Sequence, residues 1–475
     1  MRKNVENKDK KLATFTIAAL SGGSGKTIAS LSITRALKNR GLNITSFKKG
    51  PDYIDAAWLA AASGNKCYNL DPFLMNESTI RASFNLRAKK ADVAIVEGNR
   101  GLFDGMDIKG SASTAKLSKM LNSPVLLVVD CTKSTRTVAA TVLGCMRFDP
   151  SLDFIGVILN RISGPRHRKI VTEAVEAYTD LPVLGFFPRL KKDPLPMRHL
   201  GLTPADEFSA PSEAVDELAK LAEKHVDLER IVRLGTRNKT HSKSISSVEK
   251  LLNINPGIYQ GLKIGIIKDS AFQFYYPENL EALELLGAQL IFLNALTDSS
   301  IPPIDGLYIG GGFPETQAEA LMANESFRKN LLTQIQNGLP VYAECGGLMY
   351  LGQSIDWEKK RYQMVGATPF CFEMKRKPAG HGYTVLKFDS DSPFYDKGAV
   401  IKGHEFHYSK PVLNKKTGKG GFSCKVLRGT GFDGESEGFV YRNTFSTYTH
   451  IHALGQKEWP KVFLNKVAEG KRAGN

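Results

Sequence analysis

The sequence has few cysteines, and their spacing fits neither a metal site nor a disulfide framework. Six cysteines are spread over 475 residues, and no two of them form a CxxC pair. A secreted disulfide scaffold needs closely spaced cysteines, so this pattern favours free thiols in a reducing compartment. The histidines include the close pair His450 and His452 but show no Cys/His metal spacing. A structural zinc site is therefore not predicted.

Long apolar runs and a leader are also missing. No stretch of about 18 apolar residues occurs, which argues against a membrane-spanning helix. The charged start MRKNVENKDKK lacks the apolar core of a signal peptide, and we expect residues 1–11 to form a flexible tail. The sequence thus predicts a cytoplasmic protein that does not act in a membrane.

Basic residues outnumber acidic ones, and the formal net charge is +16 at pH 7. The Lys and Arg residues are scattered along the chain, without an RNP-like aromatic motif or a recognition-helix signature. A solvated basic surface accounts for such a charge as well as the attraction of anionic ligands does. This scattered distribution of positive charge suits anionic small molecules better than nucleic acid, so no nucleic acid partner is expected.

Two α/β patterns follow one another along the chain. In the first half, apolar strands are expected at 14–20, 44–48, 93–97, 125–130, 154–159 and 183–187, with helical stretches between them. This alternation predicts a doubly wound, mostly parallel sheet covered on both faces. The pattern restarts at residue 263, and shorter strands beyond residue 360 indicate a β-rich insertion. We predict domains at 12–225 and 261–475, joined by a polar linker at 226–260.

The phrase AALSGGSGKT, residues 18–27, has the order strand, glycine turn, helix start. Glycines let backbone N–H groups approach phosphate oxygens at a helix N-terminus. Lys26 can neutralise the β- and γ-phosphates, and Thr27 offers a hydroxyl group to Mg²⁺. Leu20 stands where the strict GxxxxGK[ST] spacing has glycine, and Ser21 stands where many switch ATPases have lysine. The predicted ATP-binding residues are Gly23, Ser24, Gly25, Lys26 and Thr27.

Carboxylates follow two neighbouring strands of the same sheet. Asp52 and Asp55 come after the second strand, Glu97 ends another strand, and Asp104 follows a glycine turn. Any one of them alone is more often a cap or a turn residue. Beside a phosphate loop, however, they can supply the hard oxygen ligands that a magnesium nucleotide needs. We predict that Thr27, Asp52 and Glu97 lie at the metal.

Asn160 ends another strand, in GVILNRI. Two interpretations are open for this side chain. It can contact the adenine edge of the nucleotide, or it can cap the turn after its strand.

Cys345 stands on a sharp turn between the strand GLPVYAE and the helix GGLMYLG. This arrangement is typical of a nucleophile elbow. We expect the helix N-terminus to lower the pKa of the thiol, and the Gly346 N–H to stabilise an oxyanion. The glycine turn in YIGGGFPE can complete the hole through Gly311 or Gly312. A buried structural thiol is the alternative.

A nucleophilic cysteine requires a base. The phrase STYTHIHALG places His450 and His452 on the same side of an extended segment. A histidine is usually a satisfied polar group, but an elbow cysteine in the same domain favours one of these two as the catalytic base.

Together these phrases resemble the cobyrinic acid a,c-diamide synthase family. The matching phrases keep the family's order along almost the whole chain: SGGSGKT, KKGPDYIDAAW, EGNRGLFDG, KDSAFQFYYPENLEALELLGA, GGGFPE, ECGGLMYL, GHEFHYS and TYTHIH. The resemblance implies a dethiobiotin-synthetase-like, P-loop ATP domain fused to a class I glutamine amidotransferase α/β domain. Its substrates would be L-glutamine, ATP with Mg²⁺, and a polycarboxylate tetrapyrrole.

The resemblance also implies roles for particular residues. Cys345 attacks the side-chain amide of glutamine, and His450 acts as base and acid. Released ammonia passes to the ATP domain, where an acyl phosphate of the substrate becomes an amide. The predicted site residues are then Cys345 and His450 for catalysis; Gly312 and Gly346 for the oxyanion; Gly23, Ser24, Gly25, Lys26, Thr27 and Asn160 for ATP; Thr27, Asp52 and Glu97 for Mg²⁺; and Asp55 and Asp104 for the substrate.

Two departures keep alternatives open. His452 stands where many class I amidotransferases have glutamate, so the third member of the Cys-His site is not assigned. GNRGLFDG differs from the pattern GxMGLxDG of the cobyrinate enzymes, so sirohaem and nickel-sirohydrochlorin remain alternatives to cobyrinate. A non-enzymatic switch ATPase and a ligase that uses only free ammonia are further alternatives, and a homodimer is left open.

Overall fold

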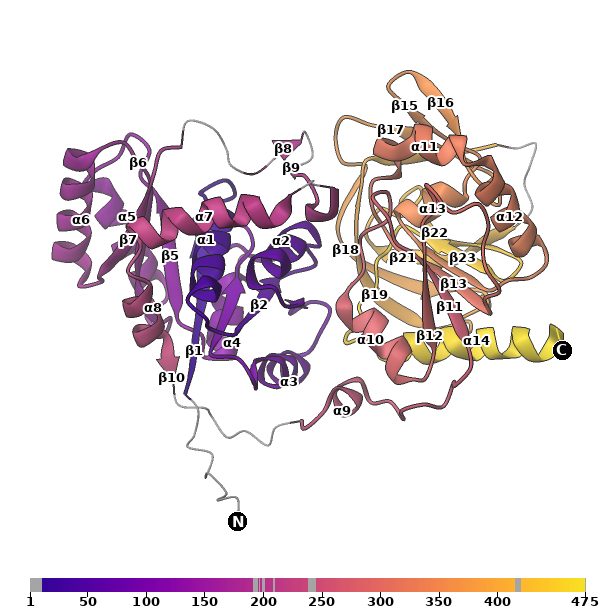
Figure 1. The fold of residues 1–475 in the computed structure, drawn as a ribbon, viewed down its shortest axis with the longest axis horizontal. Coiled ribbons are helices and arrows are strands. Elements are labelled where there is room, and N and C mark those ends of the chain that lie inside the picture. The colour runs from indigo at the N-terminus through magenta and orange to yellow at the C-terminus, as the bar shows by residue number, and fades with distance from the viewer. Residues whose placement is uncertain are drawn as a thin grey trace, which may run out of the picture. The chain divides into compact units, whose positions relative to one another are not determined.

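The computed structural model describes residues 11–190, 195, 197–198, 201–207, 210–237, 245–414 and 420–474. These residues belong to two compact units, which meet in the sequence between Ser247 and Val248 (Figure 1). The predicted tail at 1–11 lies outside the described residues, apart from Lys11.

Unit 1 is built on a parallel sheet. Its strand order is β3 (Cys67–Leu70), β2 (Ile44–Lys49), β4 (Val93–Glu97), β1 (Leu12–Ala19), β5 (Val125–Asp130), β6 (Phe154–Ile162) and β7 (Val183–Pro188), and β10 (Thr236–Arg237) pairs antiparallel with β1. Five residues of β1 pair with β4 and four with β5, so the phosphate-loop strand is central. A central strand is buried on both faces, which explains its run of apolar residues.

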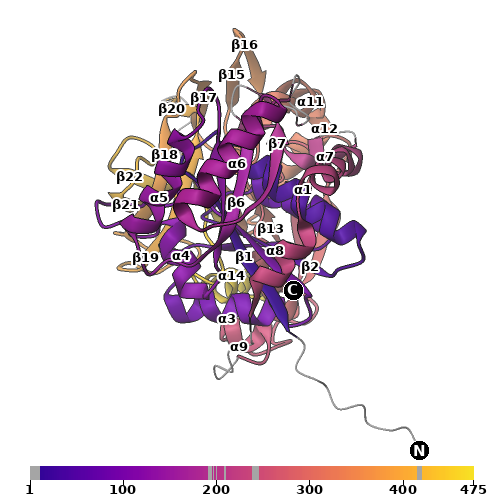
Figure 2. The ribbon, with the colours of Figure 1, turned by 90° about the vertical axis from the view of Figure 1, so that its left-hand side faces the viewer.

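Helices cover both faces of this sheet. One face carries α1 (Lys26–Asn39), α7 (Pro211–His225) and α8 (Leu228–Gly235), and the other carries α4 (Thr114–Leu121), α5 (Thr137–Phe148) and α6 (Pro165–Thr179), as Figure 2 shows. Further helices are α2 (Ile54–Ser63), α3 (Glu77–Ala88) and η1 (Ala205–Glu207), and β8 (Met197–Arg198) pairs with β9 (Gly201–Leu202). The predicted doubly wound sheet is confirmed.

The linker predicted at 226–260 differs from the structure. Helix α8 buries Ile231 against the core of unit 1, and β10 extends that unit further. Helix α9 (Val248–Leu252) then buries Leu251 and Leu252. The average composition of this segment is polar, but a few apolar residues at helical spacing are enough to dock short helices.

Unit 2 combines a parallel and an antiparallel half in one sheet. The order is β12 (Gln289–Leu293), β11 (Lys263–Ile267), β13 (Gly306–Ile309), β14 (Val341–Glu344), β23 (Thr444–Thr447), β22 (Ser436–Tyr441), β21 (Gly421–Arg428), β18 (Gly380–Phe388) and β19 (Val400–His407). The pairings are parallel as far as β23 and antiparallel after it.

A smaller sheet and several helices complete unit 2. The sheet has the order β16 (Lys360–Gln363), β15 (Ser354–Trp357), β17 (Phe370–Met374) and β20 (Ser409–Leu413). The helices are α10 (Pro277–Leu285), η2 (Pro314–Gln317), α11 (Ala318–Ala323), α12 (Glu325–Gln336), α13 (Gly346–Leu351) and α14 (Trp459–Gly474). The segment from β15 to β22 is the β-rich insertion that the sequence predicts.

Across the residues with described coordinates, none of the helices has the length and apolarity needed to cross a bilayer. All six cysteines are free thiols.

Candidate active site

The phosphate loop turns between β1 and α1 on two glycines with positive φ. Gly23 has φ 74° and Gly25 has φ 90°, in the left-handed region that favours glycine. At Gly25 a second constraint applies, because a Cβ atom there would lie 1.9 Å from Nδ2 of Asn160. Only glycine fits at this position, directly before Lys26 and the first turn of α1.

Two consecutive side chains at the end of β6 brace this loop. Asn160 Nδ2 donates a hydrogen bond to the Ser24 carbonyl (2.8 Å), and Arg161 Nη2 donates one to the Gly23 carbonyl (2.8 Å). Arg161 is itself held by an ion pair with Asp130 at the end of β5. The structure therefore uses the Asn160 amide nitrogen to support the loop, and a contact with the adenine edge would fall to its Oδ1 atom.

Behind the loop lies a buried charged cluster centred on Lys48, which we call the Lys48 cluster. Lys48 Nζ contacts Asp55 Oδ2 (2.5 Å), Glu97 Oε1 (2.9 Å) and the Gly98 carbonyl (3.2 Å). Thr27 Oγ1 donates to the same Glu97 oxygen (3.1 Å). The ends of β2 and β4 and the start of α1 thus meet at one point, as parallel strands ending at one sheet edge allow.

Burial and mutual charge set the ionisation of the cluster. Burial raises the pKa of Asp52 to about 6, and the neighbouring Asp55 adds to this shift. Burial also raises the pKa of Glu97, and it lowers that of Lys26, where Lys48 adds to the effect. For Lys48, burial opposes the charge, but the surrounding carboxylates raise its pKa. Lys48 is therefore a permanent cation facing carboxylates.

Part of the cluster fits a magnesium ion. Glu97 Oε2 is buried and makes no hydrogen bond within the described chain, while Oε1 is taken by Lys48 and Thr27. No group of three or more His, Cys, Asp or Glu residues in the described segments is arranged to hold a metal. Mg²⁺ commonly binds one or two carboxylates together with phosphates and water. Glu97 and Thr27 fit that requirement, and Asp52 lies beside Asp55, whose N–H it accepts at 3.0 Å.

Asp55 and Asp104, the two residues predicted to bind substrate, lie in different surroundings. Asp55 faces Lys48, and although burial opposes its charge, Lys48 lowers its pKa. Asp104 is exposed in the loop after β4, and its Oδ2 accepts a hydrogen bond from the Gly101 N–H (2.9 Å). It therefore holds a turn and lies outside the Lys48 cluster.

Cys345 occupies a strained turn between β14 and α13. Its φ is 48° and its ψ is −99°, a conformation that non-glycine residues rarely adopt. The Cys345 N–H donates to the Thr447 carbonyl (2.7 Å), and its thiol lies 3.8 Å from the Phe406 carbonyl. The predicted elbow geometry is present.

Glycine turns close tightly around this elbow. A Cβ atom on Gly346 would lie 3.0 Å from the backbone nitrogen of Gly312, and one on Gly312 would lie 2.0 Å from the Ala271 carbonyl oxygen. A Cβ atom on Gly311 would lie 2.3 Å from Cε1 of His450. Side chains are excluded here, so backbone N–H groups of Gly312 and Gly346 can converge on a reacting carbonyl beside the cysteine.

The ionisation of Cys345 differs from the expectation. Burial raises the pKa of the thiol, the carboxylate of Glu315 adds to this shift, and a hydrogen bond from the Gly346 N–H opposes it. Only 4% of Cys345 is exposed. The short helix α13 does not outweigh desolvation and nearby negative charge. The resting residue is therefore a thiol that needs a base.

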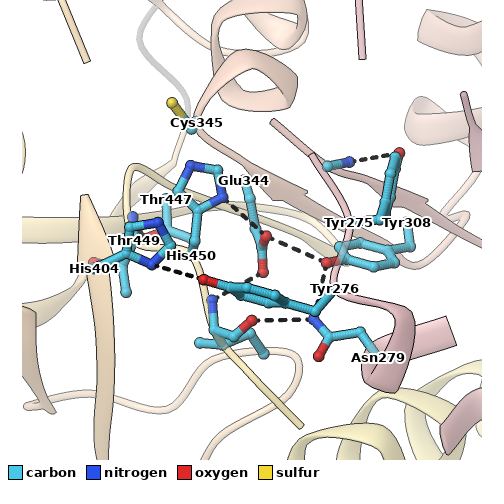
Figure 3. Close-up of polar contacts among 12 residues, drawn as sticks. Tyr275, Tyr276, Asn279, Tyr308, Glu344, Cys345, His404, Thr447, Thr449 and His450 are labelled. Carbon is cyan, nitrogen blue, oxygen red and sulfur yellow. Dashed lines mark hydrogen bonds and ion pairs between the residues drawn. The ribbon is translucent and has the colours of Figure 1, made fainter. Parts of the chain in front are cut away.

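His450 is oriented by Glu344, the residue just before the cysteine. His450 Nδ1 lies 3.3 Å from Glu344 Oε2, and both side chains are buried. Glu344 also accepts hydrogen bonds from Tyr308 Oη (3.2 Å) and the Ile451 N–H (3.4 Å). In Figure 3 the other ring nitrogen of His450 is turned to the side on which Cys345 lies. With the proton on Nδ1, Nε2 can act as the base.

His452 does not share this role. Its Nε2 lies 3.5 Å from Glu278 Oε2, its Nδ1 accepts from the Leu454 N–H (3.1 Å), and its ring packs against Tyr276. All of these contacts lie in the interior of unit 2. The structure therefore separates the two histidines of TYTHIH, since His450 lies beside Glu344 and His452 lies beside Glu278.

Comparison with known proteins assigns the family. Residues 15–201 match the CobQ/CobB/MinD/ParA nucleotide binding domain, and residues 263–458 match the CobB/CobQ-like glutamine amidotransferase domain. The cobyrinate a,c-diamide synthase of Magnetococcus marinus is 42% identical over 449 residues, which cover 93% of this chain and 94% of that protein. That of Archaeoglobus fulgidus is 41% identical, over 96% and 97% of the two chains. The chain belongs to the cobyrinate a,c-diamide synthase family.

Family membership establishes the kind of activity. The chain is an enzyme, a carbon–nitrogen ligase with glutamine as nitrogen donor. Its nucleotide-binding domain supports ATP as co-substrate. A non-enzymatic switch ATPase is thereby excluded.

Two residues that lie at the candidate sites, Lys48 and Glu344, were not predicted from the sequence. The carboxylates around Lys48 were predicted as site residues. A lysine inside an otherwise buried strand is itself a sign of a charged site, because lysine is rarely buried without a partner. Glu344 was not predicted as the partner of His450, because many class I amidotransferases have the third member two residues after the histidine, where this chain has His452. A carboxylate that ends a strand beside a nucleophile could have indicated it.

Proposed function

We propose that the protein converts the a and c carboxylates of cobyrinate to amides, giving cobyrinate a,c-diamide in cobalamin biosynthesis. The observation that carries this proposal is identity above 40% to two cobyrinate a,c-diamide synthases over more than nine-tenths of each chain. The same reaction would need a glutamine-hydrolysing site and an ATP site, and each unit contains a candidate for one of them.

In the glutamine-hydrolysing half, His450 Nε2 takes the proton of the Cys345 thiol as sulfur attacks the side-chain amide carbon. The N–H groups of Gly312 and Gly346 hold the negative oxygen of the tetrahedral intermediate. His450 then gives its proton to the departing nitrogen. Ammonia leaves, and a thioester between Cys345 and the glutamyl group remains. Water, deprotonated by His450, releases glutamate and restores the thiol. Glu344 keeps the imidazole in the required tautomer and stabilises its charged form.

In the ATP half, a substrate carboxylate oxygen attacks the γ-phosphorus and ADP leaves, which forms an acyl phosphate. Ammonia then attacks the carbonyl carbon, phosphate departs, and the amide remains. Lys26 and the N–H groups of the phosphate loop hold the transferring phosphate in place. Lys48 fixes Glu97 and Asp55 at the edge of the sheet, so their negative charge does not repel the phosphates unopposed.

Magnesium belongs to this proposal as a nucleotide-bound ion. Thr27 and Glu97 would hold it, with Asp52 nearby, and it would offset negative charge on the phosphate oxygens. Asp55 and Asp104 remain proposed substrate contacts, Asp104 through the loop after β4.

The decisive experiment offers the purified protein cobyrinate, sirohaem and nickel-sirohydrochlorin in parallel, each with ATP, Mg²⁺ and glutamine. High-resolution mass spectrometry distinguishes an amide from the carboxylate that it replaces. We expect two amides on cobyrinate. Amidation of sirohaem or nickel-sirohydrochlorin instead would keep the chemistry and replace the substrate, whereas no amide on any of the three would refute the proposal.

One substitution distinguishes glutamine hydrolysis from ATP-dependent amidation. Cys345→Ala should abolish amidation with glutamine and preserve it with added ammonium, because the nucleophile serves only ammonia release. An unchanged rate with glutamine would show that Cys345 is not the group that releases ammonia, whereas wild-type protein that amidated with ammonium but not with glutamine would be a ligase that uses only free ammonia. Loss of both activities in a folded variant would contradict separate sites.

A further inference from the structure

His404 lies directly against the proposed base. Its ring stacks on that of His450, with centroids 4.9 Å apart and planes 20° from parallel. The two residues also exchange backbone hydrogen bonds, from His404 N to His450 O (3.1 Å) and from His450 N to His404 O (2.8 Å). These bonds fix both backbones whatever side chain residue 404 carries, so the ring can be changed without removing the bridge.

The His404 ring is anchored on its other side by a phenol. Tyr276 Oη lies 3.4 Å from His404 Nδ1, and Tyr276 is fully buried (Figure 3). Among the groups that act on His404 are this hydroxyl and the imidazoles of His450, His452 and His381. Burial and these imidazoles lower the pKa of His404 well below its ordinary value. Of the two stacked rings, His450 is the one beside a carboxylate, Glu344.

We propose that His404 is a positioning residue for glutamine hydrolysis: its neutral ring fixes the plane of His450 and stabilises the imidazolium formed when Cys345 gives up its proton. A cation is stabilised over the face of an aromatic ring, and more strongly when water is excluded. This inference rests on the proposed role of His450.

Two substitutions test the stacking. His404→Ala removes the ring, and His404→Phe with Tyr276→Phe keeps a ring at residue 404 and removes the hydroxyl that faces His404 Nδ1. Glutaminase kcat should fall about tenfold in the alanine variant with little change in KM, since a stacked ring contributes roughly 1–2 kcal/mol to the charged state. The double phenylalanine variant should recover most of the loss, and Tyr276→Phe alone serves as its control. Ammonium-dependent amidation should stay unchanged in all variants.

Several results would overturn this inference. An alanine variant with wild-type kcat, or a double phenylalanine variant as slow as alanine, would show that stacking has no role. An increase confined to KM would place His404 in glutamine binding instead. If wild-type protein released no glutamate from glutamine, the proposed function would fall together with this inference.

Discussion

Glu344→Gln tests the assignment of the third member of the hydrolytic site. Glutamine keeps the size of the side chain but removes the charge 3.3 Å from His450 Nδ1. Its amide can also donate to Nδ1, which would move the ring proton to Nε2 and block the base. A hydrogen bond to a charged group contributes about 1.5–3 kcal/mol, which corresponds to a decrease of roughly 10- to 100-fold in glutaminase kcat.

The chain offers a matched control for this variant. Glu278→Gln removes an equally buried carboxylate that lies 3.5 Å from His452 rather than from His450. Glutamate release should be close to wild type in the control, and ammonium-dependent amidation should be unchanged in both variants. If Glu344→Gln hydrolysed glutamine at the wild-type rate, or if both variants lost the same activity, the pairing of Glu344 with His450 would have no catalytic meaning.

Three further predictions concern the metal, the thiol and the pH dependence. Glu97→Gln should slow ammonium-dependent amidation at least about tenfold and spare glutamine hydrolysis, since it removes the oxygen proposed for Mg²⁺; equal damage to both would contradict the assignment. Cys345 should react with iodoacetamide far more slowly than the half-buried Cys371 at neutral pH, because burial raises its pKa, as peptide mass spectrometry can check. Burial raises the pKa of Glu437 to about 8, above the ordinary value of 4.5. The folded state therefore binds more protons than the unfolded state between these values, and the free energy of unfolding falls as pH rises through this window. The Glu437→Gln variant lacks this fall in stability, so its melting temperature minus that of the wild type should increase from pH 5 to pH 8. A melting-temperature difference that stayed constant over this range would contradict the raised pKa of Glu437.

Local patterns were sufficient where the chemistry depends on neighbours in the chain. The phosphate loop, the elbow at Cys345 and most strands of both sheets were predicted at or within a few residues of their observed bounds. Strand β3 was missed because its four residues, Cys67–Leu70, are too short to show a period. The segment 226–260 was predicted as a linker because its average composition is polar. This average concealed the apolar face of α8.

Partners far apart in sequence could not be predicted in the same way. Nothing near Asn160 indicates that its amide will meet the Ser24 carbonyl, because that contact joins residues 136 positions apart. The two histidines of TYTHIH look equivalent in the sequence. They differ only because Glu344 and Glu278 come from different elements.

The sequence alone therefore determined that one chain would contain a phosphate loop and a cysteine elbow, since both are set by glycines and apolar residues within about ten positions. The tertiary structure decided which charges face one another. Ionisation depends on burial and on groups from distant strands, so only the fold could reveal that Cys345 rests as a thiol and that Lys48 stays charged inside the protein.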